Sequence, residues 1–154
     1  MTPVENIYAR ISAIIEDHTY CKLPDEDIEF LFKNFLETAI VYFKELNNKY
    51  KPTIIENDFG ELFIQKTKNI SDGDDSGLDL EEEVILAHGM IISWHRSKIL
   101  RDKFLKQNLN TGDFNRLSNA TMLANNLTLM VELEKEFTKL RRKYRNRNWS
   151  GDDF

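Results

Sequence analysis

Apolar residues recur every three or four positions along the last third of the chain, and this spacing fits only a helix. An α-helix has about 3.6 residues per turn, so side chains three or four apart share one face. The sequence predicts a long helix capped by Ser118, after a connection at 108–117. Its packed face comprises Leu123, Leu127, Met130, Leu133, Phe137, Leu140 and Tyr144.

Two earlier segments show the same helical periodicity. The first helix is predicted at 3–18, with Thr2 as its cap and Pro3 in its first turn. The second begins after Asp25, where three consecutive acids complement the positive end of the helix dipole, and it ends near Asn47.

A third helix is predicted from Leu80 to about Lys106. Asp79 suits its cap position, and Glu82 stands three residues later, where a capping box requires an acid. The first half of this segment is apolar nearly all round, which is typical of a helix through the middle of a bundle.

Residues 50–66 favour a β-hairpin, because short β-favouring runs flank a turn candidate at 57–60. A polar, acidic linker follows at 71–79. The expected fold is mainly α, a four-helix bundle-like subunit with a small β-hairpin inserted between helices 2 and 3. We expect one domain at 1–147 and a C-terminal tail at 148–154.

Composition narrows the class of protein. With 154 residues, 41% hydrophobic and 31% charged, the chain suits a single soluble domain. Its one cysteine, Cys21, excludes an intrachain disulfide and a Cys-rich zinc module. The first residues lack a signal-peptide layout, and the apolar run at 84–94 is shorter than the roughly 20 residues of a membrane helix. We therefore expect a soluble cytosolic or virion protein without membrane contact.

The acidic linker matches the spacing of a twelve-residue calcium loop. Oxygen ligands, a glycine and a final carboxylate stand at suitable positions, although the usual apolar eighth position is occupied by an acid, Asp79. An acidic linker that leads into an acid-capped helix explains the same residues. The oxygen-ligand positions are occupied by Asp72, Asp74, Ser76 and Glu83, and the glycine position by Gly77.

No other metal-binding site and no catalytic site is expected from the sequence. His18 and Cys21 supply too few zinc ligands, and His88 and His95 fit core or interface positions on the most buried helix. No nucleophile motif or phosphate loop occurs in the sequence. We expect no enzymatic activity, no catalytic residues, no cofactor and no resident metal.

The end of the last helix is strongly basic. Six cations and no acid lie within 139–147, and without them the chain's net charge of −5 becomes −11. Aromatic residues interleave with the cations, so the segment is a candidate for binding an acidic protein surface or phosphates. A basic helix end followed by a solvated tail is the simpler alternative. The candidate partner-binding residues are Lys139, Arg141, Arg142, Lys143, Tyr144, Arg145, Arg147 and Trp149.

Three stretches together resemble the head–tail connector (neck or adaptor) proteins of tailed bacteriophages. They are the acid-led apolar run LEEEVILAHGMIISW at 80–94, the segment LNTGDFNRLSNA at 109–120, and the final long helix with its Tyr- and Arg-containing end. The resemblance covers about residues 78–147. His95 and Arg96 depart from the apolar residues expected after the tryptophan.

The resemblance implies a structural virion protein located in the neck, and in the host cytoplasm during assembly. Such subunits form a homo-oligomeric ring, commonly of twelve, below the portal protein. The ring extends the DNA channel without sequence-specific DNA contact and docks the tail or a second neck protein. Apolar residues beyond one stripe, namely Phe30, Ile40, Val41 and Ile92, fit such a subunit, and the basic segment is expected to dock on an acidic surface of the portal.

Two alternatives remain open. A small DNA-binding packaging accessory protein would use the basic C-terminal segment, and its DNA binding would depend steeply on salt. A calcium-binding module would use the 72–83 loop and respond to a chelator.

Overall fold

A computed structural model describes residues 1–12, 15, 24–44, 50–68, 77–108 and 113–148 of the chain. This described part is mainly helical, with four helices and a small antiparallel sheet whose hairpin lies between the second and third helices. The predicted fold class is confirmed. The elements are β1 (Thr2–Pro3), α1 (Val4–Ser12), α2 (Asp25–Lys44), β2 (Tyr50–Glu56), β3 (Leu62–Lys68), α3 (Leu80–Asn108) and α4 (Asp113–Asn148).

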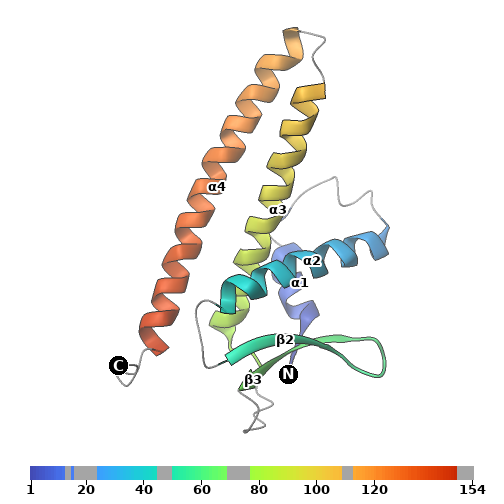
Figure 1. Ribbon diagram of the computed structural model, residues 1–154, viewed down its shortest axis with the longest axis vertical. Coiled ribbons are helices and arrows are strands. Elements are labelled where there is room, and N and C mark those ends of the chain that lie inside the picture. Colours follow the sequence, from blue (N-terminus) through green and yellow to red (C-terminus); the bar gives the residue numbers. More distant parts are fainter. Residues whose placement is uncertain (13–14, 16–23, 45–49, 69–76, 109–112, 149–154) are drawn as a thin grey trace.

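The long helices α3 and α4 run antiparallel to each other, and the smaller elements gather around the first half of α3 (Figure 1). The second half of α3 and the first half of α4 extend beyond the rest of the molecule. In the described residues, no helix combines the length and apolar composition needed to cross a membrane.

The core lies along the first half of α3, as its apolar sequence predicts. Residues 85–95 are buried, with His88 as the half-buried exception. α2 packs so closely on this helix that a Cβ added to Gly89 would lie 2.9 Å from the Cβ of Ala39. Glycine is therefore required at this contact, although it lowers intrinsic helix stability.

The hairpin is confirmed, and its turn is built by Asn57. The side-chain Oδ1 of Asn57 accepts hydrogen bonds from the backbone N–H groups of Phe59 and Glu61, at 3.0 and 2.9 Å. Gly60 has a φ of 81°, which glycine adopts without steric cost. Ile64 of β3 is fully buried against the helices, so the hairpin is not an isolated one.

The N-terminus differs from the prediction. Thr2 and Pro3 do not start the first helix; they form β1, which pairs with Ile64 and Phe63 on the open side of β3. The hydroxyl of Thr2 accepts a hydrogen bond from the backbone N–H of Leu78 at 2.7 Å. The sequence could not predict this outcome, because the groups that hold Thr2 lie more than sixty residues away.

The last helix also starts earlier than predicted. α4 begins at Asp113, so Ser118 lies inside the helix and is not its cap. Polar residues cost only about half a kcal/mol each in helix propensity, which does not prevent helix formation through 113–118. The predicted packed face is confirmed at Met130, Phe137 and Tyr144, which are buried, whereas Leu127 is 42% exposed.

Glu82 joins three elements in the core. Glu82 and Asp79 form the predicted capping box, in which each side chain accepts a hydrogen bond from the other residue's backbone N–H. The Asp79 N–H donates to Glu82 Oε2 at 2.8 Å, and the Glu82 N–H donates to Asp79 Oδ1 at 2.9 Å. The Nζ of Lys66 on β3 lies 2.5 Å from Oε2, and the Tyr144 hydroxyl on α4 donates to Oε1 at 2.6 Å. Glu82 is only 2% exposed, so these partners stabilise a charge removed from water.

We predict that Tyr144→Phe lowers the free energy of unfolding by about 2 kcal/mol, because it removes a buried hydrogen bond to a charged group. The ring contact with Phe43, at 5.7 Å between centroids, is retained in this variant. Urea unfolding provides the measurement. Arg145→Ala, an exposed position one residue along, serves as the control and should change stability by less than about 0.5 kcal/mol. An equal effect of the two variants would contradict the role assigned to the hydroxyl.

Candidate partner-binding surfaces

The predicted basic segment falls into two groups on the last turns of α4. Arg141, Tyr144 and Arg147 make contacts within the chain. The other cations are exposed, and Trp149 lies outside the described residues. The exposed group, called here the basic row, comprises Lys139, Arg142, Lys143 and Arg145.

Tyr144 and Arg147 attach the end of α4 to the start of α3, and Arg141 attaches it to α2. Arg147 pairs with Asp79 at 3.2 Å and with Glu81 at 2.6 Å. Because the two helices are antiparallel, the basic end of one meets the acidic start of the other, and both charge sets complement the helix dipoles. Arg141 donates to the backbone carbonyl of Tyr42 at 3.4 Å. These residues therefore have a structural role that the charge pattern alone did not reveal.

The basic row borders two shallow depressions. Lys139 and Arg142 line one of about 400 Å³ together with the exposed apolar side chain of Val131. Lys139 and Lys143 line a second of about 500 Å³, which His88 and Leu140 also border. The row thus offers positive charge next to apolar surface, which is typical of a protein contact.

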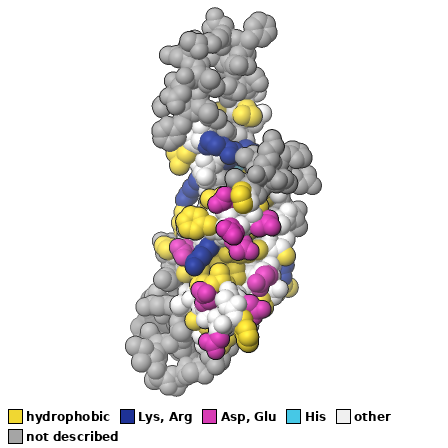
Figure 2. All heavy atoms as spheres, turned by 90° about the vertical axis from the view of Figure 1, so that its right-hand side faces the viewer, with side chains coloured by type: hydrophobic (Ala, Val, Ile, Leu, Met, Phe, Trp, Pro, Cys, Tyr) yellow, Lys and Arg dark blue, Asp and Glu magenta, His cyan; other side chains and the backbone are white. Residues whose placement is uncertain are grey.

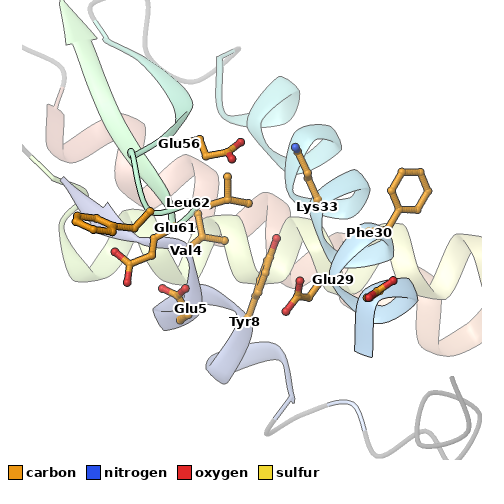
Figure 3. A pocket seen from close by; sticks show the side chains of 12 residues that line it. Val4, Glu5, Tyr8, Glu29, Phe30, Lys33, Glu56, Glu61 and Leu62 are labelled. Atoms are coloured by element: carbon orange, nitrogen blue, oxygen red, sulfur yellow. The ribbon is translucent and has the colours of Figure 1, made fainter. Parts of the chain in front are cut away.

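A further candidate surface, which the sequence did not predict, is a pocket of about 440 Å³ between α1, α2 and the hairpin. Lys33 is the single cation among its lining residues, all of which belong to the described part of the chain. Figure 3 shows carboxylates from all three elements around this pocket, and Figure 2 shows that acidic and hydrophobic side chains mix on this face. The lining acids are Glu5, Glu26, Glu29, Glu56 and Glu61.

Two aromatic side chains that line the pocket are left exposed. Phe30 on α2 is 66% exposed, and Phe59 in the hairpin turn is 89% exposed. Large exposed aromatic residues next to a concave surface are characteristic of binding sites, because they gain burial only when a partner arrives.

Tyr8 projects from α1 into the space between α1 and α2 (Figure 3). Its ring packs edge-on against Phe32, with 5.2 Å between centroids. Its hydroxyl is buried, and no hydrogen-bond partner for it occurs among the described residues. Burial, and after it the negative charges of Glu29 and Glu5, raise the pKa of Tyr8 to about 12. The hydroxyl therefore stays protonated at neutral pH.

Three of the five acids in the pocket have a local explanation, and for that reason the sequence did not indicate a site. Glu5 and Glu26 lie in the first turns of their helices, where carboxylates complement the dipole. Glu61 accepts a hydrogen bond from the side-chain amide of Asn57 at 2.8 Å within the hairpin turn. Acidic starts on both N-terminal helices were the available signal, but only the tertiary structure brings them to one place.

The calcium-loop prediction lies mostly outside the described residues, which exclude Asp72, Asp74 and Ser76. Of the remaining candidates, Gly77 packs against Thr2. Glu83 accepts hydrogen bonds on one oxygen from both Nε and Nη2 of Arg10, at 3.2 and 2.9 Å. The carboxylate expected to complete a calcium site is therefore neutralised by an arginine.

The histidines of the described part have structural surroundings. His88 Nδ1 lies 2.9 Å from the backbone carbonyl of Val84. His95 is buried beside Trp94, and burial, followed by the charge of Lys98, lowers its pKa. No three metal-ligating side chains come together among the residues that the structure describes, while His18 and Cys21 fall outside them.

Comparisons with protein-family models, curated proteins and solved structures find no match to this chain.

We predict that Tyr8 titrates with a pKa of about 12, above its ordinary value of 10.0. The unfolded chain loses this proton first, so the contribution of Tyr8 to stability is present below pH 10.0 and lost as the pH rises to about 12. Tyrosine ring NMR signals report the titration, and Glu29→Gln should lower the pKa because it removes a nearby negative charge. In urea unfolding, Tyr8→Phe should lose less stability than the wild type over the same pH interval. A Tyr8 midpoint near 10.0 would contradict the buried environment.

Proposed function

We propose that this chain is a structural subunit of a bacteriophage head–tail connector, which assembles as a ring below the portal and extends the DNA channel. Two independent features support the proposal. The first is the sequence resemblance over residues 78–147. The second, which carries the proposal, is the apolar surface that the chain's own core leaves exposed.

This surface occurs on several elements. Val41 on α2, Leu100 on α3 and Val131 on α4 are each at least half exposed, although the core beside them is complete. Of the four residues that the sequence suggested for subunit contacts, Phe30 and Val41 are exposed, but Ile40 and Ile92 are buried in the subunit's own core. Apolar side chains exposed on different helices suit a subunit with more than one neighbour, because a ring requires two unlike contacts.

The charge distribution supports a protein partner for the basic row. The body of the chain is acidic and repels DNA, whereas the basic row is exposed and borders apolar surface. The partners in this proposal are further copies of the chain, the portal protein, and the tail or a second neck protein. The protein would reside in the neck of the virion and, during assembly, in the host cytoplasm.

We predict that the purified chain, alone at millimolar concentration or mixed with the portal protein of the same genome, forms a closed oligomer of about twelve copies. Light scattering gives the mass, and negative-stain images give the shape. Leu127→Gln/Val131→Gln should weaken assembly by removing exposed apolar contacts. Ala124→Gln/Glu132→Gln, on exposed positions of the same helix, is the matched control. A monomer that ignores the portal would refute the connector function.

A DNA-binding packaging accessory protein is the second candidate, and the four exposed cations of the basic row favour it. Fluorescence anisotropy with duplex DNA separates the two functions. A DNA-binding protein would show affinity that falls steeply with salt and is lost in Lys139→Glu/Arg142→Glu. A connector subunit should bind DNA weakly, and its association with protein partners should respond to the same substitutions.

The calcium-binding module has less support, because Arg10 already pairs with Glu83. A calorimetric calcium titration that is saturable in the wild type and absent in Asp72→Ala/Glu83→Ala would favour it.

A further inference from the structure

We propose that the acidic pocket between α1, α2 and the hairpin receives the basic row of α4 from a second copy of this chain. This inference rests on the proposed function, since it assigns the contact by which neighbouring ring subunits recognise one another. Three features support this occupant: the opposite charges of the two surfaces, the aromatic rings of the pocket, and the positions of the two surfaces on the subunit.

Charge complementarity is the first argument. Five carboxylates and one lysine line the pocket, and the basic row presents four cations without an intervening acid. Opposite potentials of this kind guide two surfaces together and fix their register. They also oppose contact between two pockets or between two basic rows, so the interaction is directional.

The aromatic and polar groups of the pocket suit an arginine in particular. Guanidinium planes stack on aromatic faces and form paired hydrogen bonds with carboxylates. Phe30 and Phe59 supply exposed rings, and Glu29 and Glu56 supply carboxylates on either side of Lys33 (Figure 3). The Tyr8 hydroxyl, buried without a hydrogen-bond partner in the described part, has lone pairs to accept an arginine N–H.

The positions of the two surfaces exclude their pairing within one chain. In Figure 1 the hairpin turn and the start of α2 lie on the right, and α4 lies on the left with α3 between them. A contact between opposite sides of identical subunits is head-to-tail. Such contacts close into a ring when the rotation between subunits permits it.

A charge exchange tests this contact. In Glu29→Lys/Glu56→Lys the pocket loses its net negative charge while the basic row is unchanged. In Lys139→Glu/Arg142→Glu the row loses its net positive charge while the pocket is unchanged. All four positions are exposed in the subunit, so both variants are expected to fold, and circular dichroism verifies this. Arg101→Glu/Lys103→Glu, on exposed positions of α3, is the control for net charge.

Sedimentation at low ionic strength should show that each pocket or row variant alone self-associates at least about tenfold more weakly than the wild type. The control variant should retain wild-type association. An equimolar mixture of the two variants should recover association between unlike copies, because the unchanged basic row of one variant meets the unchanged acidic pocket of the other.

Four outcomes would overturn the inference. The first is equal loss in the control variant, and the second is no recovery in the mixture. The third is a pocket variant that self-associates normally but no longer binds the portal, which would assign the pocket to a basic segment of the portal. A wild-type protein that remains monomeric at millimolar concentration also refutes this contact. The connector function is then tested separately, by whether the protein forms rings on the portal.

Discussion

The buried carboxylate of Glu82 joins segments that lie far apart in the sequence, and the arrangement of the sheet and the long helices depends on it. It caps its own helix, pairs with Lys66 on the central strand and accepts a hydrogen bond from Tyr144 near the end of α4. A charge this deeply buried is stable only while its partners remain in place. The hairpin, α3 and α4 are therefore linked through this side chain as well as through the apolar core.

This connection determines which charges stay available for partners. Because Tyr144 faces Glu82, the helical spacing turns Arg141 and Arg147 toward the chain's own surface, where Arg147 meets the acids at the start of α3. The basic row is consequently presented outward. At the other side of the molecule, the packing of α1 and α2 with the hairpin gathers carboxylates around Tyr8. The subunit thus carries opposite charges on opposite sides, which is the polarity that a head-to-tail assembly requires.

The exposed apolar side chains would contribute to assembly differently from the charged residues. Val41, Leu100 and Val131 are at least half exposed in the single subunit. In an assembly of copies, burial of these side chains would stabilise the contact without fixing its orientation, whereas the charged surfaces would fix the register of neighbouring subunits. The proposed connector function combines these two contributions.

The sequence by itself determined the helices, the hairpin with its Asn57 turn, and the Asp79–Glu82 capping box, because these depend on residues close together in the chain. It also located the basic segment. Only the tertiary structure decided that Thr2 pairs with β3, that Lys66 and Tyr144 meet Glu82, and that five acids surround one pocket. Local periodicity and capping indicate which face of an element is buried. They contain no information on which distant element covers that face, and the candidate site is formed by such distant contacts.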